Sequence, residues 1–187
     1  MNSAVLLLRD LQARLGQFRR DQGGVSAVEF AMLLPLMLAL YLGTAEISQG
    51  ISADRKVTLT TRTVADLVSQ VASINNADMT NSLNAASTVM APFGSSNLKV
   101  TVTSVTIDGT GKATVAWSDT FQGTAHATGS TVTLPAALNV ANTSLIWSEV
   151  QYAYKPTIGY IVSGTLTLKD QIYMRPRLSD TVTRVNS

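Results

Sequence analysis

The chain has 187 residues and no cysteine, and only 14% of its residues are charged, against roughly 25% in an ordinary soluble domain. The missing cysteine excludes disulfides, thiolate metal sites and cysteine catalysis. Of the 14 basic and 12 acidic residues, four basic and two acidic ones lie in residues 1–24, which leaves ten of each in residues 25–187. A nucleic-acid partner would require a basic face on the outer part of the chain, so we expect no nucleic-acid partner.

An apolar segment occupies residues 25–45, and Glu29 is its one charged residue. A helix of this length would extend roughly 31 Å, about one hydrocarbon thickness, at about 1.5 Å per residue. The four arginines before it place the N-terminus in the cytoplasm by the positive-inside rule. We therefore expect one membrane span, with everything after residue 45 outside.

Two residues disturb this apolar segment. A carboxylate in hydrocarbon is costly, so Glu29 is either a functional group or lies close enough to the interface to stay hydrated. Pro35 removes one backbone donor, and we expect it to kink or locally open the helix.

The residues around the start of the segment resemble a known motif. A glycine after a basic leader, with a glutamate five residues later in a long apolar helix, resembles the cleavage motif of type IV pilins and pseudopilins. The longer string is similar to the N-terminal signature of the TadE-like family, minor pilins or pseudopilins of the tight-adherence (Flp, type IVb) pilus system. That similarity is carried by Gly24, Glu29, Phe30, Pro35, Gly43 and Glu46.

The resemblance implies a processing and assembly role. A prepilin peptidase would cut between Gly24 and Val25 on the cytoplasmic side of the bacterial inner membrane. Glu29 could then pair with the new α-amino group of a neighbouring subunit, which offsets the cost of burying either charge. Phe30 would begin the apolar surface that packs against other pilus or pseudopilus subunits, and the C-terminal domain would be periplasmic or extracellular.

An ordinary secretory signal is the competing interpretation. The sequence Gly43-Thr44-Ala45 fits a signal-peptidase site, and cleavage there would release a protein beginning at Glu46. Under this alternative the chain is a signal-anchored or secreted, non-enzymatic binding or adhesion protein of the cell envelope. A third possibility is that the apolar segment is a signal anchor that is not cleaved.

The remainder divides into a helical part and a sheet. Residues 46–74 keep helical spacing and extend the anchor helix, and Asp78 is expected to cap a second helix. That helix would bury one apolar face, made by Met79, Leu83, Ala86 and Met90. The chain is thus divided into a leader (1–24), an anchor (25–45), a helical extension (46–74) and an outer domain (75–187).

From residue 98 the hydrophobic period changes to two, which predicts strands. Asp108-Gly109-Thr110-Gly111 predicts a hairpin turn, and a shift of the apolar phase suggests a bulge near Thr103 and Ser104. We expect strands around 98–107, 113–117, 146–154 and 166–174, a short helical turn after Pro135 and a turn over 156–164. The predicted fold is α+β, with the second helix packed on an antiparallel sheet of about four strands, as in pilins.

The residue inventory offers little chemistry. His126, the one histidine, is expected to be a solvated loop residue, and Gly109-Thr110-Gly111-Lys112 lacks the spacing of a phosphate loop. We expect no catalytic residues, no metal site and no cofactor, and therefore no enzyme. Trp117, Trp147, Tyr152 and Tyr154 could form an adhesive aromatic patch, but strand alternation makes at least half of them core residues or cross-strand partners, and we expect core packing.

Overall fold

The computed structural model describes residues 22–156, 159 and 164–185. Residues 1–21 of the predicted leader and most of the turn predicted over 156–164 lie outside the described residues. The chain separates into two compact units, residues 1–45 and 46–187.

The longest helix is α2, Gln22–Ser69, which contains Pro35 and continues on both sides of it. It ends earlier than the helical extension predicted to residue 74. Ser73–Ile74 instead forms a short strand, β1, which pairs in parallel with β6, Thr183–Arg184. The prediction was wrong here because the backbone of this segment bonds to the distant C-terminal strand, a contact that helical periodicity does not register.

The second helix, α3, spans Asn76–Met90. Its N-cap is Asn75, whose side chain accepts a hydrogen bond of 2.8 Å from the Asp78 backbone N–H. The prediction of Asp78 as the cap was therefore three residues too late, because the favoured cap side chain accepts from the third helical residue. The predicted face of α3 is confirmed, since its buried residues are Met79, Leu83, Ala86 and Met90.

The sheet of the second unit has four antiparallel strands in the order β3-β2-β4-β5. They are β2, Leu98–Ile107; β3, Ala113–Phe121; β4, Thr143–Tyr154; and β5, Leu166–Met174. Two 3-10 turns, Ser95–Asn97 and Ala136–Leu138, precede β2 and β4. The α+β fold with about four antiparallel strands is confirmed.

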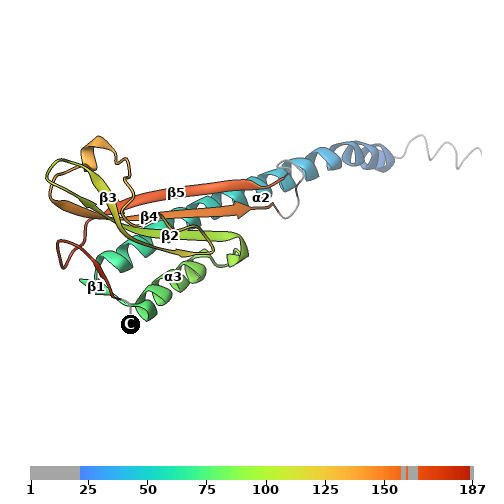
Figure 1. Cartoon of the computed structure of the whole chain (residues 1–187). Helices are drawn as coiled ribbons and strands as arrows, with labels where there is room; N and C mark the ends of the chain where they lie inside the picture. The colour runs from blue at the N-terminus through green and yellow to red at the C-terminus, as the bar shows by residue number, and fades with distance from the viewer. Residues whose placement is uncertain (1–21, 157–158, 160–163, 186–187) are drawn as a thin grey trace, which may run out of the picture. The chain divides into compact units, whose positions relative to one another are not determined.

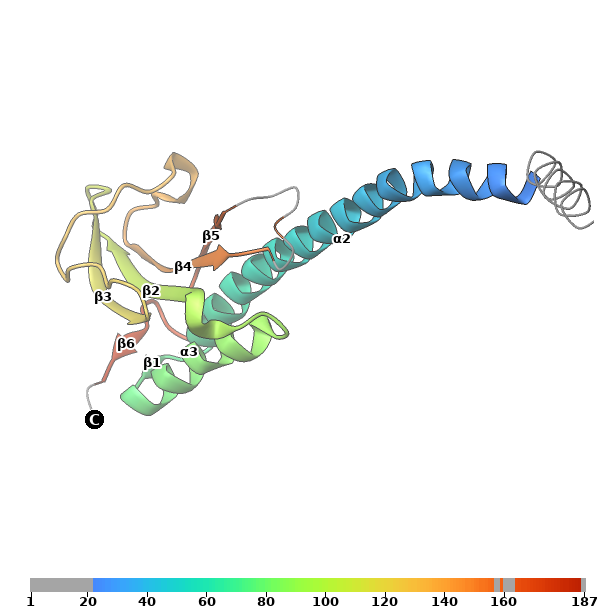
Figure 2. The same cartoon turned by 90° about the vertical axis from the view of Figure 1, so that its right-hand side faces the viewer.

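One face of the sheet carries the main core. The later turns of α2 and the helix α3 pack against it (Figures 1 and 2). We call it the inner face. Its buried residues include Val57 and Val64 of α2, Leu83 of α3, and Val100 and Val150 of the sheet. Trp117, Tyr152 and Tyr154 belong to the same core, whereas Trp147 packs on the opposite, outer face with a second cluster.

The bulge predicted near Thr103 and Ser104 is present where β2 pairs with β3, but its extra residue lies on β3. The ladder between β2 and β4 is regular from Leu98 to Ile107, so β2 itself contains no bulge. The irregularity lies in the pairing with β3, where Ser104 faces Trp117 and Val105 faces Val115. Ala116 is thus the extra residue. Val105 and Ile107 are buried in the second cluster on the outer face, which explains why the apolar pattern changes sides.

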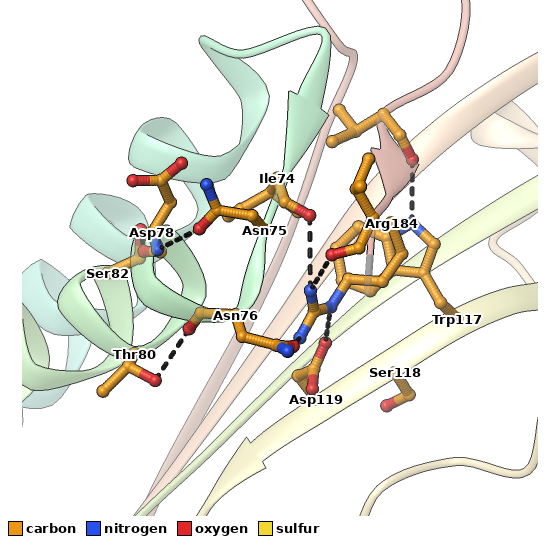
Figure 3. A network of polar contacts seen from close by, with 12 residues as sticks. Ile74, Asn75, Asn76, Asp78, Thr80, Ser82, Trp117, Ser118, Asp119 and Arg184 are labelled. Atoms are coloured by element: carbon orange, nitrogen blue, oxygen red, sulfur yellow. Dashed lines mark hydrogen bonds and ion pairs between the residues drawn. The ribbon is translucent and has the colours of Figure 1, made fainter. Parts of the chain in front are cut away.

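The C-terminal segment fastens the second unit together, as Figure 3 shows. The Arg184 guanidinium donates to Asp119 Oδ2 at 2.7 Å, to the Asn76 side-chain oxygen at 2.6 Å and to the Ile74 carbonyl at 3.3 Å. Beside it, Trp117 Nε1 donates to the Val182 carbonyl at 2.8 Å. The end of the chain thereby connects β1, α3 and β3.

Candidate membrane anchor and assembly helix

The first part of α2 presents apolar side chains on all sides. Those of residues 25–41 that are large and exposed are Val25, Val28, Phe30, Met32, Leu33, Leu34, Leu36, Met37, Leu38, Leu40 and Tyr41. Such a helix differs from the one-sided helix of a soluble domain, whose apolar residues form a single stripe. Burial of apolar surface stabilises by roughly 25 cal/mol per Å², so this helix is stable in hydrocarbon or against other helices.

By length and composition, α2 is the one helix in the described part of the chain that could cross a membrane, and its most apolar window has no buried residue. This fits a single-pass membrane anchor. The prediction from the sequence is confirmed to that extent.

The residues predicted for processing are accessible on this helix. Gly24 is exposed, and no atom outside its own stretch of helix lies within 4 Å of the position that a Cβ would take. Val25 is 60% exposed. A protein that contacts the Gly24–Val25 bond would therefore meet no side chain from elsewhere in the described residues.

Glu29 is also exposed, and none of the ion pairs within the described residues involves it. It follows Val25 by four residues, so the two side chains lie on the same side of the helix. Phe30, 57% exposed, points about 100° away around the axis. The helix thus brings Val25 and Glu29 together and separates them from Phe30.

Pro35 lies inside α2 without interrupting it. Its missing N–H leaves one carbonyl in the preceding turn without its helical donor. The predicted kink at this position stays a prediction.

Glu46, the acidic residue near the end of the predicted motif, lies in the second unit and has a structural contact. Its side chain is among the buried ones, 3% exposed, and one carboxylate oxygen accepts a hydrogen bond of 2.7 Å from the Gly159 backbone N–H. It also influences a neighbour: burial first, and then the charge of Glu46, raise the pKa of Tyr154. Sequence reasoning placed Glu46 in the motif but gave it no partner.

His126 is a second residue whose surroundings the sequence did not reveal. The expectation of a solvated loop residue was wrong. Its Nε2 lies 2.6 Å from Glu149 Oε2, its ring stacks on Trp147 with centroids 4.7 Å apart, and its side chain is 34% exposed. The alternation of β4 places Trp147 and Glu149 on one face, but only the folded loop supplies the imidazole.

Residues 24–66 match the family described as TadE-like protein. This segment is similar to TadE-like proteins. The match confirms the resemblance drawn from the sequence and spans the anchor and most of the remaining part of α2. It indicates involvement in the tight-adherence pilus system. No curated protein and no solved structure matches the chain.

Proposed function

We propose that the chain is a minor pilin or pseudopilin that supports assembly of a tight-adherence (type IVb) pilus. The observation that carries the proposal is that the TadE-like segment, residues 24–66, begins with a helical stretch, residues 25–41, whose apolar side chains are exposed on every side. One such helix anchors the subunit in the bacterial inner membrane and offers a packing surface to other subunits. The role is non-enzymatic.

Processing by a prepilin peptidase after Gly24 is part of the proposal. The accessibility of Gly24 and Val25 supports it. The competing signal-peptidase site at residues 43–45 lies inside α2, next to the buried Glu46. Cleavage there would have to unwind the middle of this helix, whereas the Gly24–Val25 bond lies in its first turn, where fewer backbone hydrogen bonds hold the chain.

The processing proposal is tested by sequencing the N-terminus of the mature protein from the native membrane. We expect it to begin at Val25, and Gly24→Ala to accumulate in the uncut form. Gly23→Ala, one residue further from the bond, is the matched control and should mature normally. A mature protein that begins at Glu46, or normal cleavage of Gly24→Ala, contradicts the assignment.

Glu29 is proposed to set the register between packed helices. Its carboxylate is exposed on an otherwise apolar surface, so a helix bundle would bury it, and a neighbouring subunit's α-amino group would stabilise the charge there. We expect Glu29→Ala and the isosteric Glu29→Gln to be processed but to lose co-purification with other pilus subunits. Unchanged co-purification of both variants would rule out the register role.

The orientation with the outer domain outside follows from the arginines before the anchor. Because the chain has no cysteine, single introduced cysteines report topology directly. Ser96, exposed beside β2, should react as Ser96→Cys with a membrane-impermeant maleimide on spheroplasts. In the uncut Gly24→Ala protein, Ser3→Cys in the leader should react only after the membrane is opened. The reverse labelling pattern would contradict the orientation.

A further inference from the structure

The outer face of the sheet is divided into an apolar half and a polar half. The apolar half contains Val105, Ile107, Ala113 and Leu145, and it is covered by Val132, Leu134 and Leu138 from the segment between β3 and β4. The polar half lies on the same face, where strand alternation places six residues: Lys99, Thr101, Glu149, Gln151, Lys169 and Gln171. There the side chains line a cleft of about 600 Å³.

The floor of this cleft consists of two rows across three strands. In one row Glu149 of β4 lies between Thr101 of β2 and Gln171 of β5. In the next row Gln151 lies between Lys99 and Lys169. Because neighbouring strands are about 4.8 Å apart, the two lysine Cα atoms lie about 9.6 Å from each other. The cleft therefore presents two spaced cations beside a carboxylate and two amides.

The carboxylate of Glu149 is held in place before any ligand arrives. His126 Nε2 contacts Glu149 Oε2 at 2.6 Å, and the His126 backbone N–H donates to Ser118 Oγ at 3.1 Å. The imidazole stacks on Trp147, which in turn stacks on Tyr173 at a centroid distance of 5.6 Å. This arrangement fixes one carboxylate oxygen and leaves the other as an acceptor for a donor in the cleft.

The cations of the cleft have no such partner. Among the ion pairs of the described residues, none involves Lys99 or Lys169. Asp170 also borders the cleft, but strand alternation turns its side chain to the inner face, and its Oδ1 accepts from the Gln171 backbone N–H at 2.9 Å. The two ammonium groups are thus available to an anionic ligand.

We propose that this polar cleft binds an acidic glycan, a chain of sugars that carries carboxylates. The lysines supply spaced cations for the carboxylates, while Glu149, Gln151 and Gln171 supply hydrogen-bonding groups for sugar hydroxyls. An acidic peptide would satisfy the lysines but would offer Glu149 and the two amides only one backbone N–H per residue, whereas each sugar offers several hydroxyls that both donate and accept. A neutral glycan would leave both lysines without a counter-charge. The binding function is separate from pilus assembly, which depends on α2.

The test uses the full chain in detergent micelles and isothermal titration calorimetry with three probes at low salt. We expect saturable binding of tetragalacturonate, and binding at least about tenfold weaker for cellotetraose and for tetraglutamate, since a lost charge-assisted hydrogen bond is worth about 1.5–3 kcal/mol. Equal binding of tetraglutamate, stronger binding of cellotetraose, or no binding of tetragalacturonate would overturn the proposal.

Three variants locate the binding site. Lys99→Ala and Lys169→Ala should each weaken tetragalacturonate binding about tenfold, while Lys112→Ala, at the turn next to the apolar half, is the matched control and should bind as the wild type does. Glu149→Gln keeps the side-chain shape and should lower affinity by removing the charged acceptor. Each variant is compared by its melting temperature, so a loss of affinity without a loss of fold supports the site. Unchanged affinity in both lysine variants contradicts it.

Discussion

The carboxylate of Glu46 accepts a 2.7 Å hydrogen bond from the backbone N–H of Gly159, 113 residues further along the chain. The same residue is 3% exposed. Its charge is the second cause, after burial, that raises the pKa of Tyr154. A residue at the start of the second unit thus bonds to a backbone N–H beyond the end of β4. The last acidic residue of the TadE-like motif therefore makes a structural contact in the folded protein, in addition to being part of the family's sequence signature.

Substitution of Glu46 should test this role. Glu46→Ala removes a buried, charged acceptor, so we expect the free energy of unfolding to fall by about 1.5 kcal/mol, the lower end for a hydrogen bond to a charged group, because Gly159 itself is exposed. Glu46→Gln keeps a carbonyl oxygen and should lose less. Chemical denaturation of the full chain in micelles, followed by tryptophan fluorescence, measures both. An Ala variant as stable as the wild type would contradict the role.

The C-terminal fastening predicts a strong effect at Arg184. Its side chain is 15% exposed and donates to Asp119, Asn76 and two carbonyls. We expect Arg184→Ala to destabilise the second unit by about 2–3 kcal/mol, in the range of hydrogen bonds to charged groups. Arg184→Lys keeps the charge but cannot reach all of these partners from one planar group, so its melting temperature should fall between those of the Ala variant and the wild type.

Stability should decrease at alkaline pH. Burial raises the pKa of Tyr152 and of Tyr154 above the ordinary value near 10. The unfolded chain therefore loses these protons before the folded one, so the stabilisation is complete below about pH 10 and is lost as pH rises through the folded pKa values. Melting temperatures between pH 8 and 11.5 measure the decline. Tyr154→Phe should make it shallower, and an unchanged slope would contradict this account.

Two glycines predict opposite responses to alanine. At Gly50, inside α2, the nearest atom to an added Cβ is Tyr154 Cε1 at 3.8 Å, an ordinary contact. Gly50→Ala should therefore stabilise by about 0.5–1 kcal/mol through helix propensity. At Gly123 the added Cβ would lie 2.5 Å from Thr120 Oγ1 and 3.1 Å from Thr101 Oγ1. Gly123→Ala should destabilise by about 1–3 kcal/mol. Thermal melts of both variants check the contrast.

The cap of α3 can be assigned by mutation. Asn75 accepts from the Asp78 N–H, so Asn75→Ala should cost about 1 kcal/mol, whereas Asn75→Asp, another favoured cap, should cost much less. Asp78→Ala removes only a charge near the helix N-terminus and should cost about 0.3–1 kcal/mol. Urea midpoints order the three variants, and a larger effect at Asp78 than at Asn75 would contradict the assignment.

Local patterns in the sequence were enough for the elements that depend on neighbouring residues. The apolar run after Gly24 predicted the anchor because every residue there must suit hydrocarbon. The buried face of α3 followed from helical spacing, and the turn followed from the sequence Asp108-Gly109-Thr110-Gly111. The structure adds that the Asp108 side chain accepts from the Thr110 and Lys112 N–H groups at 2.8 and 3.0 Å. Each of these features depends on residues that lie close together in the sequence.

Tertiary structure alone decided the features that join distant residues. The end of α2 at Ser69 depends on backbone bonds to the C-terminal segment, including Arg177 N to Ser69 O at 2.9 Å. The phase shift of β2 came from a second apolar cluster on the outer face rather than from a bulge in that strand. The contact between His126 and Glu149 forms because the loop that contains His126 folds over β4.

The apolar segment and the low charged fraction of the sequence already indicated an anchored chain, because hydrocarbon accommodates few charges. The sequence could not place the charges that remain. Folding buried the carboxylate of Glu46, paired that of Glu149 and left Lys99 and Lys169 facing a cleft. The surroundings of these charges depend on strand register and on contacts between residues far apart in the sequence. A short stretch of sequence does not predict either of them.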